Sequence, residues 1–155
     1  MESDPLDDVR EAQRVADRAE AAPYIDFPPT PWWYPPAAGL WAGALVSMLA
    51  LTERRSPISV VGIALLLLVQ MAFVTWYTRY HGALPSPKGA PPEFRPAFAR
   101  YTAGILVIMA AGALVWLLLN AWVAAATTAV LVTVGLTLYE RAYADAAERT
   151  RARLG

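Results

Sequence analysis

Very few residues of this 155-residue chain have side chains that could catalyse a reaction or hold a metal. The chain has no cysteine and one histidine, which excludes disulfides, thiolate metal sites and sites that need two imidazoles from one chain. His81 lies near Arg79 and Glu93 in the sequence, so an interfacial lipid-modifying enzyme is one hypothesis. A lone histidine beside a membrane is usually a polar anchor, and the chain has no HExxH motif and no P-loop. We therefore expect a protein that is not an enzyme and that holds no cofactor or metal.

Two polar residues lie where they could interact inside a membrane. Gln70 lies about 18 Å from the outer start of the second apolar stretch, and Thr133 lies at nearly the same depth in the fourth. A hydrogen bond between them would contribute about 0.6–2 kcal/mol to helix association. The polar residues inside the apolar stretches are not ionisable, which counts against a proton-coupled antiporter. We predict an intramembrane contact between Gln70 and Thr133.

Small residues in the first apolar stretch form a helix-contact motif. Gly39 and Gly43 are four residues apart, the spacing at which two helix backbones approach closely. Alanines at 121, 125 and 129 make a similar stripe in the fourth stretch. We favour packing within one bundle over dimerisation as the role of both stripes.

The composition indicates that helices in a membrane position these residues. Hydrophobic residues make up 57% of the chain, against about 45–50% in soluble domains. Four stretches near the length of a bilayer crossing, approximately 33–51, 58–77, 101–119 and 122–139, contain no Asp, Glu, Lys or Arg. A soluble four-helix bundle would need polar stripes that segments such as 103–119 lack. The predicted fold is an all-α membrane protein with four transmembrane helices arranged as two antiparallel hairpins.

The basic residues predict the orientation. Eleven of the thirteen Lys and Arg residues lie in 1–35, 78–100 and the tail, while the turns between paired spans hold only Arg54 and Arg55. Cytoplasmic loops carry the excess of Lys and Arg. We therefore expect a multi-pass protein of the cell (plasma) membrane with its N- and C-termini in the cytoplasm. The candidate interface anchors are Trp32, Trp33, Trp76 and Tyr80.

The chain divides into four parts. Residues 1–22 should form a charged cytoplasmic helix that ends before Pro23, and 23–36 should form a stiff Pro-rich linker. Residues 37–139 hold the transmembrane domain. Residues 140–155 should continue the fourth helix into the cytoplasm, because no Gly or Pro interrupts them before Gly155. The helix at 1–22 has a thin apolar stripe of Leu6, Val9, Ala12, Ala16 and Ala19.

The order of these features resembles a family of small actinobacterial four-helix integral membrane proteins of unassigned function. The residues that carry the resemblance are the charged first helix, Pro31-Trp32-Trp33-Tyr34-Pro35, Trp76-Tyr77-Thr78-Arg79-Tyr80 and the Arg-rich tail after Tyr139. Twelve arginines against one lysine suit a GC-rich genome. The resemblance implies the four-span fold and no functional residues.

These features favour a non-enzymatic accessory or scaffolding subunit, because the segments with room to bind a partner all lie on the predicted cytoplasmic side. The alternative is a homo-oligomeric channel or small-solute transporter, against which the lack of a polar track argues. The expected partners are the lipid bilayer and a membrane or cytoplasmic protein, with a homo-oligomer also open. A formal net charge of zero argues against nucleic acid as a partner.

Overall fold

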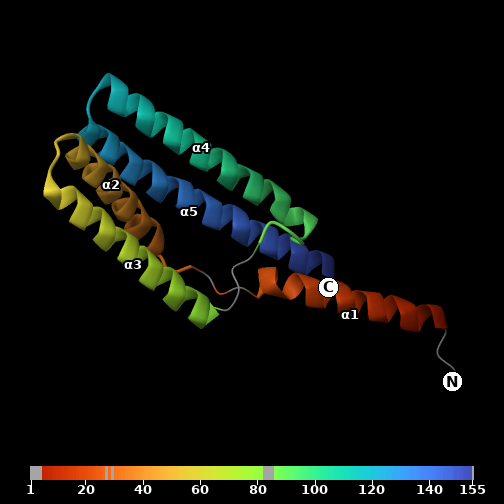
Figure 1. The fold of residues 1–155 in the computed structure, drawn as a ribbon. Coiled ribbons are helices and arrows are strands. Elements are labelled where there is room, and N and C mark those ends of the chain that lie inside the picture. The colour runs from red at the N-terminus through yellow and green to blue at the C-terminus, as the bar shows by residue number, and fades with distance from the viewer. Residues whose placement is uncertain (1–4, 27, 29, 82–85, 155) are drawn as a thin grey trace.

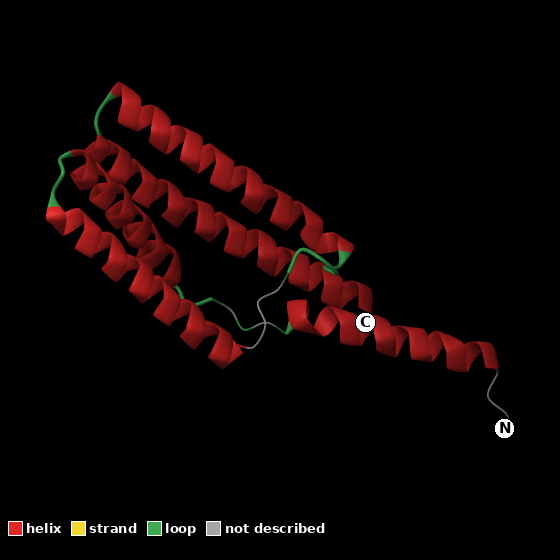
Figure 2. Ribbon diagram, in the orientation of Figure 1, coloured by secondary structure: helices red, strands yellow, loops and turns green. Residues whose placement is uncertain are grey.

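The computed structural model describes residues 5–26, 28, 30–81 and 86–154, with side chains described for the same ranges except 5–8, 80 and 81. Every regular element in these ranges is helical, as Figure 2 shows. The elements are α1 (Pro5–Ile25), α2 (Tyr34–Glu53), α3 (Pro57–His81), the 3₁₀ turn η1 (Pro92–Phe94), α4 (Arg95–Leu118) and α5 (Ala121–Leu154). The prediction of an all-helical chain is confirmed for these residues.

Four helices of the described chain, α2, α3, α4 and α5, are long and apolar enough to cross a membrane. This confirms the prediction of four candidate spans. Helix α5 has 34 residues and is therefore about 51 Å long. Since a bilayer core is about 30 Å thick, α5 is roughly 20 Å longer than one crossing requires.

Several helix ends differ from the predicted bounds. Helix α3 continues four residues past the predicted end at 77, and both ends of the predicted Pro-rich linker 23–36 are helical, in α1 and α2. Helix α4 begins at Arg95, six residues before the predicted start of the third span. Pro96 lies in its first turn, where the fixed φ of proline suits a helix and the missing N–H costs nothing. Helix α1 continues through Pro23 to Ile25, whereas we predicted its end before this proline. Tyr24 and Ile25 are buried, and this packing offsets the backbone hydrogen bond that Pro23 cannot donate.

The four long helices form a row in the order α3, α2, α5, α4 (Figure 1). Helices α2 and α5 make the most extensive contact, α3 packs on α2, and α4 packs on α5. Among the described residues, α3 and α4 do not contact each other. The central pair is therefore α2 and α5, and α3 and α4 each keep most of their surface free.

The two short connections lie at the same end of the row, which we call the turn end (Figure 1). Asn120 starts α5 there, because its Oδ1 accepts hydrogen bonds from the backbone N–H groups of Trp122 (3.0 Å) and Val123 (2.9 Å). Between α2 and α3, Arg55 adopts a left-handed conformation with φ of 53°. Asn120 caps the start of α5, and Arg55 supplies a left-handed turn residue after α2. Residues of this kind let the chain reverse direction within a few residues.

The opposite end holds a small apolar cluster, which we call the cap. Its buried residues are Tyr24, Phe94, Ala146 and Ala147, so it joins the end of α1, the turn η1 and the distal part of α5. Beyond the cap, α1 extends away from the rest of the molecule (Figure 1). The side chains of residues 9–20 are all exposed, and we call this part of α1 the arm.

Candidate functional site

A groove of about 850 Å³ lies on one face of the row, and all four long helices contribute to it. Its floor is the α2–α5 pair. Its walls are α3 and α4, which are not in contact with each other. The main lining residues are Tyr34, Ala37, Ala38 and Trp41 of α2, Val69, Gln70 and Phe73 of α3, Tyr101, Gly104 and Ile105 of α4, and Val132, Gly135, Leu136 and Tyr139 of α5. The groove is therefore lined mainly by apolar and aromatic side chains.

Aromatic side chains gather where the groove approaches the cap. On one side, Tyr34 stacks on Phe73 with ring centroids 5.6 Å apart, and Phe73 contacts Tyr77 at 5.7 Å. On the other side, Tyr101 and Tyr139 lie 4.8 Å apart. Rings with an apolar body and a polar tip are common at the depth of lipid headgroups. The aromatic cluster thus agrees with a membrane boundary near this end of the groove.

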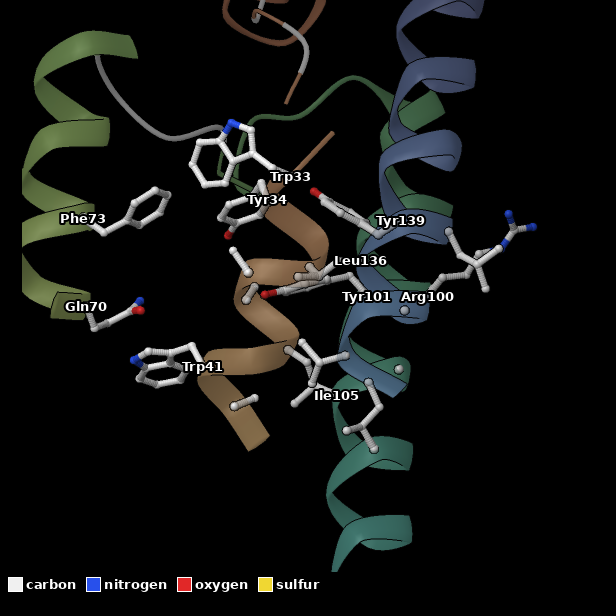
Figure 3. Close-up of a pocket in the computed structure, with 18 of the residues that line it drawn as sticks. Trp33, Tyr34, Trp41, Gln70, Phe73, Arg100, Tyr101, Ile105, Leu136 and Tyr139 are labelled. Atoms are coloured by element: carbon white, nitrogen blue, oxygen red, sulfur yellow. The ribbon is translucent and has the colours of Figure 1, made fainter. Parts of the chain in front are cut away.

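The α3 wall bears the amide of Gln70. Figure 3 shows Gln70 and Phe73 directed from α3 toward α2, where Trp41 and Tyr34 face them. Arg100 also lines the groove, and its guanidinium points away from α3 in the same view. The indole N–H of Trp41 donates to the backbone oxygen of Leu66 at 3.1 Å and ties α2 to α3.

The structure does not bring Gln70 and Thr133 together. The hydroxyl of Thr133 donates to the backbone oxygen of Ala129 at 2.8 Å, and this threonine packs against Gly39. Gln70 is exposed on the groove side of α3 and makes no hydrogen bond with another described residue. Similar depth in the membrane was the basis of the predicted pair, but depth does not specify which way a side chain points around its helix.

Gly39 and Gly43, the candidate packing residues, lie buried between α2 and α5. A Cβ atom built at Gly43 would lie 3.0 Å from the backbone oxygen of Ala125 and 2.9 Å from the Cβ of Ala129. The two small-residue stripes therefore meet each other inside the molecule. This placement agrees with packing within the bundle as their role, and it leaves them out of the groove.

The candidate interface anchors lie near the groove's aromatic end. Trp32 is 87% exposed just before α2, Trp33 lines the groove, and Trp76 is exposed on α3. Tyr80 belongs to α3, but its side chain lies outside the described residues, as does that of His81. The predicted grouping of His81 with Arg79 and Glu93 is therefore not described.

The cap contains the residues that the sequence did not single out. Phe94 is completely buried, and its ring lies 4.8 Å from that of Tyr143 and 5.5 Å from that of Tyr24. The Tyr143 hydroxyl donates to the backbone oxygen of Tyr24 at 3.2 Å, and the Arg153 guanidinium pairs with Glu93 at 2.6 Å. The one sequence feature that could have identified Phe94 is its large apolar side chain within a Pro-rich polar segment.

The polar groups that line the groove are tyrosine hydroxyls, tryptophan indoles, the Gln70 amide and Arg100. The lining residues include no carboxylate, imidazole or thiol. No group of three or more His, Cys, Asp or Glu side chains in the described chain could hold a metal ion. Apolar walls with one amide can hold a hydrocarbon surface and supply one hydrogen-bonding position. Comparisons with protein-family models, curated proteins and solved structures found no match to this chain.

Proposed function

We propose that this chain is a non-enzymatic accessory or scaffolding subunit of the cell membrane that binds a partner protein through its arm. In this proposal α2–α3 and α4–α5 are two antiparallel hairpins that cross the bilayer. The cap, the arm and both chain ends then lie in the cytoplasm.

The distribution of basic residues supports this orientation. The segments at the cap end carry eleven of the thirteen Lys and Arg residues, and the turn end carries only Arg54 and Arg55. Lys and Arg are enriched in cytoplasmic segments next to transmembrane helices. This uneven distribution of Lys and Arg favours a cap on the cytoplasmic side.

The observation that carries the proposal is an exposed helix held at one end. Tyr24 and Ile25 are buried against the cap, and Arg151 donates a hydrogen bond to the backbone oxygen of Ile25. Among the described residues, α1 contacts α5 but not α2, α3 or α4. A solvated helix of this length gains little stability by itself, so its role is best explained by a second protein that covers it.

The chemistry of the arm suggests a helical partner. Val9, Ala12, Ala16 and Ala19 repeat at intervals of three, four and three residues, as in the seam of a coiled coil. Charged side chains of both signs cover the other faces of the arm, including the exposed Arg14–Glu11 pair at 3.4 Å. A partner helix with small or aliphatic seam residues would complement it.

The test is purification of the full chain from its native membranes in mild detergent, with mass spectrometry of the intact particle. Ala16→Glu places a charge in the seam, while Arg14→Gln changes the net charge by the same amount on the opposite side of the helix. We expect a stoichiometric second protein with the native chain and Arg14→Gln, and at least tenfold less of it with Ala16→Glu. Equal recovery with both variants would contradict the proposal. Solute flux in liposomes that contain the chain alone would favour a channel instead.

A further inference from the structure

Gln70 occupies an unusual position for a polar side chain. It lies one residue beyond the midpoint of the 25-residue helix α3, so it is at the centre of a membrane crossing. It is exposed, it faces the groove, and its amide makes no hydrogen bond with any described residue. An amide has two N–H donors and one acceptor oxygen to satisfy. In hydrocarbon, where no water is available, this arrangement is unfavourable.

Four other polar side chains in the spans show how such a cost is avoided. The hydroxyls of Ser47, Thr133 and Thr137 each donate to the backbone oxygen four residues earlier, at 2.8–2.9 Å. The indole of Trp41 donates to Leu66 on the neighbouring helix. The Gln70 amide bonds neither to the backbone of its own helix nor to a neighbouring helix. No described residue supplies a partner for this amide, so a second molecule can supply one.

Lipid tails cannot supply that partner, because they contain no hydrogen-bonding group. A second copy of this chain can, because the amide is both donor and acceptor and thus complements itself. In the single orientation proposed above for all copies, a two-fold axis along the membrane normal places both Gln70 side chains at the same depth. The groove of about 850 Å³ lies between α3 and α4, which are not in contact, and it can receive side chains of a facing helix.

We propose that this chain forms a homodimer in which α3 of each copy enters the groove of the other, with the two Gln70 amides hydrogen-bonded across the axis. Helix α3 can occupy this position because α2 is its only neighbour among the described elements. The α3 residues that face the second copy are Val69, Gln70 and Phe73. The glycines of α2 take no part, since Gly39 and Gly43 already face α5.

The absence of cysteine from the chain makes a direct test available. Val69→Cys places a thiol on the groove side and keeps Gln70, while Leu68→Cys is its control on the opposite side of α3. The two positions are 60% and 61% exposed and lie at nearly the same depth. In vesicles of the full chain under oxidising conditions, we expect disulfide-linked dimers at least fivefold more abundant with Val69→Cys. Equal yields from the two variants would overturn the proposal.

The contribution of the Gln70 amide to dimer stability can be measured separately. Förster transfer between labelled full-length chains in vesicles of varied protein density gives the dimer dissociation constant. We expect Gln70→Leu to raise this constant about 3- to 30-fold, and Gln70→Asn to raise it less. An unchanged constant for Gln70→Leu, or a monomer with lipid in the groove at every density, would overturn the proposal. The arm is intact in all these variants, so this result is independent of the partner proposed above.

Discussion

Single glycines determine how closely the two central helices approach. Gly39 and Gly43 of α2 lie against the backbone of α5 at Ala129 and Ala125. The absence of a side chain allows the two backbones to touch, and dispersion contacts and weak polar contacts then stabilise the pair. Because lipid is as apolar as the helix surfaces, such close packing matters more here than in water.

Gly39→Ala should therefore destabilise the molecule. The added Cβ would overlap the backbone oxygen of Ala129, which cannot rotate away. The overpacking should lower the free energy of unfolding by about 1–3 kcal/mol, measured as a lower melting temperature in detergent by circular dichroism. Gly104→Ala is the control, because its Cβ would meet no atom within 4 Å. That control should be neutral or stabilising by up to about 1 kcal/mol. A Gly39→Ala variant as stable as the native chain would contradict this account of the α2–α5 contact.

At the scale of elements, the cap fixes three segments that are distant in sequence. The hydroxyl of Tyr24 donates to the backbone oxygen of Ser86 at 2.8 Å, and the ring of Phe94 fills the space between α1 and α5. Thr150 is fully buried and donates to the backbone oxygen of Ala146. The cap thus determines where the arm leaves the molecule.

Phe94→Ala should loosen the cap without separating the membrane helices. Loss of this ring leaves a cavity that costs about 3–5 kcal/mol in a packed core. Hydrogen exchange of residues 86–94 and of the last turns of α5 should therefore accelerate at least tenfold, while the α2–α5 contact stays protected. Arg95→Ala changes an exposed neighbour and should leave exchange unchanged. Native exchange in Phe94→Ala would show that the cap is not held by this ring.

The elements were predictable to different degrees. Uninterrupted apolar stretches predict α2 to α5, because only long helices satisfy the backbone inside a bilayer. The cap could not be predicted, since Tyr24, Phe94 and Tyr143 come from three segments whose meeting depends on the tertiary fold. The pairing of Gln70 with Thr133 used depth alone, and the rotation of each helix about its axis is set by packing. That packing places Thr133 against Gly39.

The whole molecule is strongly asymmetric from end to end. One end of the helix row carries the cap and the arm, while the other has only two short turns (Figure 1). In the proposed membrane arrangement, nearly all of the water-exposed surface lies on one side of the membrane. Partner binding through the arm, and dimer formation through α3, would therefore use separate regions of the molecule.

The most direct test of this account is the labelling of single cysteines in intact cells with a membrane-impermeant maleimide. Ser56→Cys reports on the turn between α2 and α3, and Ser86→Cys reports on the segment that contacts Tyr24 at the cap. We expect Ser56→Cys to react in intact cells and Ser86→Cys to react only after permeabilisation. The reverse pattern would place the arm outside the cell, and labelling of both positions in intact cells would contradict a membrane domain that separates them.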